Sequence, residues 1–273
     1  MKLTTLIENK RVDNRVQCEH GLSFLLQING LQILFDTGQS DKLISNAQQL
    51  NIQLEDIDYV ILSHGHYDHT GGLPAFLNIN SKAKVIIHPL AFKQRFSRST
   101  KMIKENGIAW RHKMEQYAHR LLFIDEDIEL ADQVWILTNI KAQKGFEVIN
   151  ERLVCKAADQ YVPDVFSDEL ILVAKDNANP IVICGCAHTG IVNILHEVHQ
   201  RLQFSNFSVV AGGLHLSGQP DDIIQKTING LQPFKVEQWA LNHCTGDRAL
   251  ELFNAAYPDR VVYSGGGHVI SDQ

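Results

Sequence analysis

The stretch Ser63-His64-Gly65-His66-Tyr67-Asp68-His69-Thr70-Gly71-Gly72 closes an apolar run, YVILS at 59–63, that predicts a buried strand. In an extended segment, residues two apart project to the same side, so His64 and His66 can bind one metal ion. Asp68 and His69 follow on a turn that the glycines allow to bend tightly. Imidazole nitrogens and a carboxylate suit zinc, although manganese and iron also accept them. The stretch therefore predicts a metal site with His64, His66, Asp68 and His69, in which Asp68 also serves as the catalytic partner of a metal-bound water.

The composition agrees with a metal site and excludes several other classes of protein. The chain of 273 residues contains 13 histidines, one for every 21 residues, and histidine is the commonest metal ligand. A net charge of −6 argues against a broad basic face for nucleic acid. Neither a signal peptide nor an apolar run of about 18 residues is present, which predicts a cytoplasmic protein without membrane contact. Five scattered cysteines suggest no disulfide framework, and the oligomeric state stays open.

The order of predicted elements indicates an α+β protein. Strands are expected at 3–8, 21–28, 31–36, 59–63, 85–88, 134–137, 169–174, 180–185, 207–212, 238–242 and 260–263. Helices are expected at 41–50, 73–77, 190–200, 221–231 and 247–256. Both halves begin with strands and then alternate strand with helix. This pattern predicts two mixed sheets stacked face to face with helices outside, as one domain spanning 1–273.

A basic stretch interrupts this pattern at about 89–120, where we expect a helical cap over the site. Lys93, Arg95 and Arg98 begin a run of basic residues that contains no acid up to Lys104. These side chains are candidates to clamp a phosphate group. The alternative is a solvated helix face, because Lys and Arg normally cover surfaces.

Three later histidines, His188, His215 and His243, each follow a predicted strand. Because the carboxyl ends of neighbouring strands meet at one edge, we expect all three beside the first metal loop. His215 is a candidate substrate contact or proton donor, with a structural role as the alternative. Thr189 and Thr245 each open a helix, and the N–H groups at a helix N-terminus favour anions such as phosphate.

The H-x-H-x-D-H pattern at 64–69 resembles the metal-binding motif of the metallo-β-lactamase superfamily. The resemblance implies an αββα sandwich that binds one or two divalent ions, most typically zinc. It also implies that Asp36, in ILFDTG, braces the metal loop. The ligand sets implied are His64, His66 and His188 for the first metal, and Asp68, His69 and His243 for the second.

The sequence departs from this family pattern where most hydrolases of the superfamily have Gly-Asp. This chain has Gly185-Cys186, so the Cys186 thiolate is a candidate bridging ligand; the acidic alternatives are Asp164, Asp168 and Glu169. His66 stands where the diiron flavoproteins of the superfamily have Glu, which argues against a redox diiron site. A T-P-G-H segment is missing, which argues against a glyoxalase II type of thioesterase.

Landmarks along nearly the full chain resemble one branch, the 7,8-dihydropterin-6-yl-methyl-4-(β-D-ribofuranosyl)aminobenzene-5′-phosphate synthase family. They are TLIEN, EHGLSFLLQ, ILFDTGQS, LSHGHYDHTGGL, GCAHTGIVNIL, GGLHL and NHCTG. The resemblance implies a metal-dependent transferase that acts on a phosphorylated small molecule and releases pyrophosphate. The first alternative is a hydrolase of phosphoesters, lactones or cyclic phosphodiesters. The second is a metal-binding or ligand-sensing module without catalysis.

Overall fold

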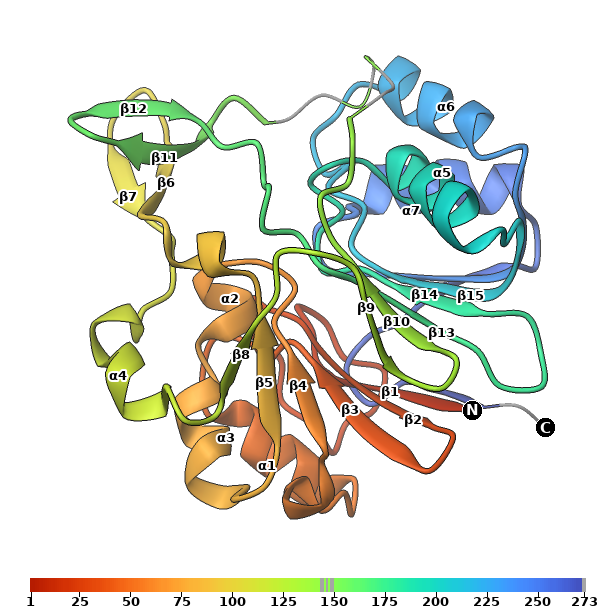
Figure 1. Ribbon diagram of the computed structural model, residues 1–273. Coiled ribbons are helices and arrows are strands. Elements are labelled where there is room, and N and C mark those ends of the chain that lie inside the picture. Colours follow the sequence, from red (N-terminus) through yellow and green to blue (C-terminus); the bar gives the residue numbers. More distant parts are fainter. Residues whose placement is uncertain (143–144, 146, 148–149, 272–273) are drawn as a thin grey trace. The chain divides into compact units, whose positions relative to one another are not determined.

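The computed structural model describes residues 1–142, 145, 147 and 150–271 (Figure 1). The chain folds into two compact units, and each unit is made of segments that are separate in the sequence. The first unit contains 1–125, 150–170 and 265–271, and the second contains the described residues of 126–149 together with 171–264. The chain thus passes between the units four times.

A mixed sheet of seven strands forms the centre of the first unit, in the order β18-β1-β2-β3-β4-β5-β8. Its strands are β1 (Lys2–Ile7), β2 (Ser23–Ile28), β3 (Leu31–Phe35), β4 (Tyr59–Ile61), β5 (Lys84–Ile87), β8 (Leu121–Phe123) and β18 (Val269–Ser271). The predicted hairpin between β2 and β3 is confirmed. Asn29 and Gly30 take positive φ angles of 51° and 78°, as the tight turns preferred by twisted hairpins require.

From β3 to β8 the neighbouring strands are parallel, and helices provide the crossovers. The helices of this part are α1 (Lys42–Gln49), η1 (Leu54–Asp56), α2 (Tyr67–Thr70) and α3 (Leu73–Ile79). Leu34, Val60 and Val85 of the sheet share one buried cluster with Leu43 of α1 and Phe76 of α3. This packing explains why the strand before the metal loop is a continuous apolar run.

The segment 89–120 contains less helix than the sequence predicts. It folds as η2 (Pro89–Phe92), β6 (Arg95–Arg98), β7 (Ile103–Glu105), η3 (Arg111–Lys113) and α4 (Met114–Tyr117). β6 and β7 join β11 (Leu153–Ala157) and β12 (Gln160–Pro163) in an antiparallel sheet with the order β12-β11-β6-β7. The prediction of a helix is wrong for Arg95–Arg98 and Ile103–Glu105, because β6 pairs with β11, which lies far along the chain and leaves no local signal.

The second unit is built on another mixed sheet of seven strands, in the order β17-β16-β15-β14-β13-β10-β9. Its strands are β9 (Ile128–Ala131), β10 (Val134–Leu137), β13 (Ile171–Ala174), β14 (Ile181–Ile183), β15 (Asn206–Gly212), β16 (Lys235–Leu241) and β17 (Val261–Tyr263). Its helices are α5 (Ile191–Leu202), α6 (Asp221–Gly230) and α7 (Asp247–Ala256). The two sheets and their helices confirm the predicted α+β class.

The core of the second unit packs these helices onto the sheet. Trp239 of β16 contacts Phe253 of α7, with ring centroids 5.7 Å apart, and both side chains are buried. Strands β14 to β17 are parallel, so the loops after β14, β15 and β16 leave the same edge of this sheet. Among the described residues, α5 is the longest helix with 12 residues, and none of the described helices has the length and apolar character needed to cross a bilayer.

Candidate metal centre

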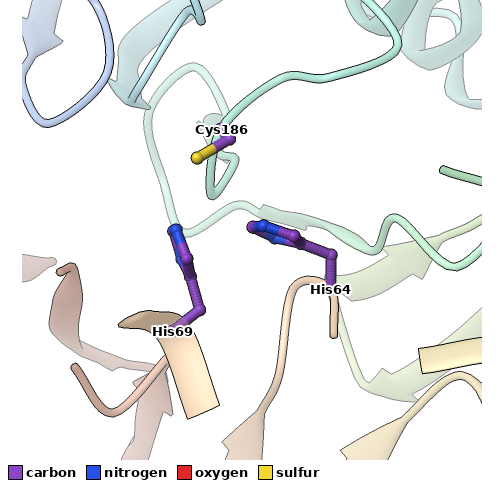
Figure 2. Close-up of side chains that lie close together, drawn as sticks. All are labelled: His64, His69 and Cys186. Carbon is purple, nitrogen blue, oxygen red and sulfur yellow. The ribbon is translucent and has the colours of Figure 1, made fainter. Parts of the chain in front are cut away.

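The histidines of the metal loop lie together in the first unit, from the end of β4 into helix α2, which contains His69. Nε2 of His64 is 2.9 Å from Nδ1 of His66, and the rings of His64 and His69 have centroids 4.2 Å apart. Figure 2 shows the rings of His64 and His69, both fully buried. Three imidazoles are thus brought together within six residues of sequence, as the H-x-H-x-D-H spacing predicts.

Asp36 lies directly beneath this loop, and its backbone has a positive φ of 61°. Its carboxylate accepts hydrogen bonds from the backbone N–H and the Oγ of Ser63, both at 2.7 Å. It also lies 2.6 Å from Nδ1 of His69. Asp36 is fully buried, so these contacts take the place of water around its charge.

These contacts decide which ring nitrogens could bind a metal. Nδ1 of His69 is bonded to Asp36, and Nδ1 of His64 lies 2.9 Å from Oγ of Ser63, which itself donates to Asp36. In both rings Nε2 is therefore the candidate metal-binding nitrogen, while His66 presents Nδ1 toward His64. A hydrogen bond from the remaining ring nitrogen is the usual way in which proteins orient metal-binding histidines.

Burial also favours the protonation state that a metal requires. It lowers the pKa of His64 well below its ordinary value of 6.5, and the neighbouring His69 and His66 lower that pKa further. His64 is consequently neutral near pH 7, with a lone pair available for a cation. The donor set of the first unit therefore fits a divalent ion such as zinc.

Asp68 has a partner that the sequence did not single out for the site. Its Oδ2 lies 3.1 Å from Nε2 of His20 and 3.8 Å from Nε2 of His69. Gly21 permits this approach, because a Cβ there would stand 2.6 Å from the backbone oxygen of Asp68. The signal available in the sequence was the His20-Gly21 pair before a strand.

Arg95 supports the metal loop from the side. Its guanidinium, 1% exposed, donates to Asp164 at 2.6 Å, to Asp168 and to the backbone oxygen of Ala91. Asp168 in turn accepts the backbone N–H of Gly65 at 2.8 Å. Burial alone would lower the pKa of Arg95, but Asp168 and Asp164 raise that pKa, so the guanidinium stays charged.

This arrangement corrects three sequence-based assignments. Arg95 is a buried brace and not an exposed phosphate clamp. Asp164 and Asp168 neutralise Arg95, so they do not replace the usual bridging aspartate. Of the remaining candidates, Arg98 is exposed with its guanidinium 5.9 Å from the ring centroid of Tyr161, Lys93 is half-buried, and Glu169 is buried.

In the second unit, the loops after β14, β15 and β16 carry the other candidate residues. Each loop contains one residue in the left-handed region that is not glycine: Ala187 (φ 49°), His215 (φ 51°) and His243 (φ 52°). Residues other than glycine seldom adopt this conformation, and backbone strain of this kind concentrates at functional sites. The prediction that His188, His215 and His243 follow strand ends is confirmed.

Two of these loops bring candidate donors together within the second unit. One donor atom each from Cys186, His188 and His215 lies within 4.8 Å of the others. The rings of His188 and His215 have centroids 4.4 Å apart. Cys186, also labelled in Figure 2, is 3% exposed in the loop after β14. Thiolate and imidazole donors of this kind suit zinc.

Cys244, which sequence reasoning left unassigned, joins this group. Its Sγ accepts the backbone N–H of His215 at 3.3 Å. Burial alone would raise the pKa of the Cys244 thiol, but contacts with Cys186 and His215 hold that pKa well below its ordinary value of 9.0. The signal in the sequence was the position of Cys244 directly after His243.

The two predicted anion-binding helix ends begin as expected, at Gly190 and Gly246. At α5, the carboxylate of Glu147 accepts the N–H groups of Val192 at 2.9 Å and Asn193 at 2.8 Å. A pocket beside this helix end is lined by Glu147 together with His188 and His215. This helix end therefore holds an anionic group of the chain itself.

The two threonines differ in what they contact. Thr245 is fully buried, and its Oγ1 accepts the N–H of Leu214 at 3.1 Å. This contact joins the loops after β15 and β16. The backbone oxygen of Thr189 accepts the side-chain amide of Asn193 at 2.8 Å. Both therefore stabilise the loops from which α5 and α7 start.

Comparisons of the sequence and of the structure with known proteins point to the same superfamily. Residues 16–121 match the family described as Metallo-beta-lactamase superfamily. The chain is 30% identical over 246 residues to the 7,8-dihydropterin-6-methyl-4-(beta-D-ribofuranosyl)-aminobenzene-5'-phosphate synthase of Methanocaldococcus jannaschii. That match covers 86% of this chain and 84% of the synthase. An uncharacterized protein of the same organism is 30% identical over 92% of this chain and 93% of its own length.

Among solved structures, the chain is similar to Tm1679, described as a metal-dependent hydrolase of the beta-lactamase superfamily. The TM-score is 0.84 and the identity 28%, over 100% of this chain and 99% of that one. The likeness thus extends over the elements of both units.

Proposed function

The chain belongs to the metallo-β-lactamase superfamily and has its fold, and on this premise we propose that it is a dinuclear zinc enzyme that transfers a group between phosphorylated small molecules. The observation that carries the proposal is the buried histidine cluster, in which Asp36 and Ser63 fix the nitrogens that face a cation. A histidine cluster of purely structural use would not require this control of ring nitrogens.

The proposal assigns the ligands as the sequence suggests. In the first unit, His64, His66, Asp68 and His69 are the proposed ligands, and in the second unit the proposed ligands are His188, His243 and Cys186. When bound, such ions act as Lewis acids that lower the pKa of bound water and neutralise a leaving pyrophosphate. Manganese and iron are the alternatives to zinc, since both accept histidine and aspartate.

The other side chains move protons and hold the substrate. Asp68 accepts a proton from the attacking group, and His20, 3.1 Å from its Oδ2, orients that carboxylate. His215 donates a proton to the leaving group. Lys93 and Arg98 of the first unit contribute positive charge for a phosphate group of the substrate.

The second candidate is a hydrolase of phosphoesters, lactones or cyclic phosphodiesters at the same centre. The similarity to Tm1679, described as a metal-dependent hydrolase, favours it. In this case water takes the place of the acceptor, and the same residues perform the proton transfers. The synthase likeness at 30% identity supports transfer as the first choice.

Pyrophosphate release distinguishes the two reactions. The zinc-loaded protein is given a dihydropterin-methyl pyrophosphate with and without a ribofuranosyl-aminobenzene phosphate acceptor. Release that needs the acceptor supports transfer, and release without it supports hydrolysis. Chelation should abolish either activity and zinc should restore it, whereas Asp68→Asn should be inactive and the exposed-residue control His112→Ala fully active. Full activity in protein shown to be metal-free would overturn the proposal.

A further inference from the structure

We propose that Cys244 is a metal ligand, which together with Cys186 and His243 forms a thiolate-rich site for a thiophilic divalent cation in the second unit. This inference deepens the proposed function, because it assigns to that metal centre a ligand that the superfamily motifs do not predict. It also changes the chemistry of the centre from mainly nitrogen and oxygen donors to sulfur donors.

The first support is the geometry of the three side chains. One donor atom each from Cys186, His243 and Cys244 lies within 4.8 Å of the other two. Cys186 and His243 are buried, so few water molecules compete for the cation. All three belong to the loops after β14 and β16, two strands that both pair with β15. The site is thus contained in one unit and does not depend on the first metal loop.

The second support is the way in which the fold fixes Cys244. The N–H of His215 donates to Sγ of Cys244 at 3.3 Å, and the N–H of Ser217 donates to its backbone oxygen at 3.1 Å. Gly213 leaves the space that Sγ occupies, since a Cβ there would stand 2.5 Å from the sulfur. An N–H bond to sulfur stabilises a thiolate and orients it, as outer-shell partners do in metal sites.

The third support is the donor chemistry. Two thiolates and a neutral imidazole balance the charge of a divalent ion, and a Cys₂His set with an open fourth position is an established arrangement for catalytic zinc. On binding, each thiol loses its proton to solvent and its sulfur donates a lone pair to the cation, with no change in oxidation state. The site therefore needs no oxidant or second reactant.

Cobalt(II) is the probe for the sulfur ligands, because cobalt–thiolate bonds absorb in the near ultraviolet whereas cobalt–imidazole bonds do not. We expect the full-length reduced protein to show this absorption. Cys244→Ser and Cys186→Ser should each keep about half of it, since each retains one of two thiolates, and should bind zinc at least about 10-fold more weakly. The control Cys184→Ala removes a nearby thiol that contacts Ala211 and Gly213, and should change neither value.

Gly213→Ala gives a test that leaves every ligand in place. Its added Cβ displaces the sulfur of Cys244, so zinc affinity and the cobalt–thiolate absorption should both fall. In the unaltered protein, zinc should also protect Cys244 and Cys186 from iodoacetamide, while the partly exposed Cys18 stays reactive by mass spectrometry. This second measurement does not depend on the folding of any variant.

The outcomes separate this inference from the proposed function. Cobalt binding without thiolate absorption, or full absorption in Cys244→Ser, overturns the role of Cys244 and leaves the histidine centre of the first unit standing. A protein that binds neither cobalt nor zinc overturns both proposals.

Discussion

At the scale of single residues, the decisive side chain is Asp36. Its carboxylate bonds the backbone and hydroxyl of Ser63 and the ring of His69, so one buried side chain positions the strand end and a candidate metal ligand together. The left-handed backbone at Asp36 lets the chain turn while the carboxylate stays beneath the loop. The sequence signal for this role was the family likeness of ILFDTG and not any local rule.

Asp36→Asn should therefore weaken metal binding without unfolding the first unit. Asn tolerates the left-handed conformation, but its amide cannot accept hydrogen bonds from all the groups that Asp36 holds. We expect zinc affinity to fall by about 10- to 100-fold, as for other outer-shell partners, measured by calorimetric titration. Asp58→Asn, which changes a partly exposed carboxylate of the same unit, is the matched control. Unchanged affinity in Asp36→Asn would contradict the bracing role.

A second residue-scale prediction concerns His88, whose Nδ1 accepts the N–H of Leu90 at 3.1 Å. Burial lowers the pKa of His88 from its ordinary value of 6.5. Below pH 6.5 the unfolded chain binds a proton that the folded chain resists, so the free energy of unfolding falls as the pH falls. Above pH 6.5 this loss is absent.

His88→Asn keeps an oxygen that caps Leu90 but removes the titration. Denaturant unfolding of both metal-free proteins from above to below pH 6.5 should therefore show a smaller loss of stability in the variant. Identical pH profiles would contradict the assignment of this titration to His88. The other histidines are the same in both proteins, so their titration cancels in the difference.

At the scale of elements, strand β6 links the basic segment to the metal loop. Arg95 points inward to Asp164 and Asp168, while Arg98 at the end of the same strand is exposed. Through Asp168 this ion group also holds the N–H of Gly65, between the first two histidines. The four-stranded sheet that contains β6 thus stabilises the metal loop.

Arg95→Met should destabilise the protein by about 3–5 kcal/mol, because it leaves two buried carboxylates without their cation. The same change at the exposed Arg98 should cost no more than about 0.5 kcal/mol. Urea unfolding of the two variants beside the unaltered protein measures both values. Equal effects at the two positions would show that the buried ion group contributes no stability of its own.

At the scale of the whole molecule, the chain alternates between two units, and each unit holds its own group of candidate metal-binding side chains. The first group lies within six residues, whereas the second comes from three loops of one sheet. A ligand that binds only the folded protein stabilises it by mass action, so zinc should raise the free energy of unfolding.

Zinc at 100 times its dissociation constant should stabilise the protein by about 2.7 kcal/mol, as followed by denaturation in zinc and in chelator. His64→Ala should lose most of this gain, because it removes a ligand that Ser63 has positioned. His112→Ala, which changes an exposed histidine, should keep it in full. Equal stability in zinc and in chelator would argue against a metal centre in the folded protein.

The sequence by itself determined the features that depend on short-range pattern. The spacing of His64, His66 and His69 brings three candidate ligands together because two-residue alternation and a tight turn are local geometry. The hairpin at Asn29-Gly30 and the first residues of helices α5 and α7 follow from local turn preferences in the same way. Each of these features depends on residues that are adjacent in the sequence.

Only the tertiary structure decided the roles that depend on burial and on distant partners. Arg95 belongs to a basic run typical of a surface, yet it is buried because β6 pairs with β11 and the partner carboxylates lie 69 and 73 residues away. Cys244 joins Cys186 across 58 residues because β14 and β16 end at one edge of a sheet. Contacts of this kind are set by which strands pair, and no local sequence pattern encodes that pairing.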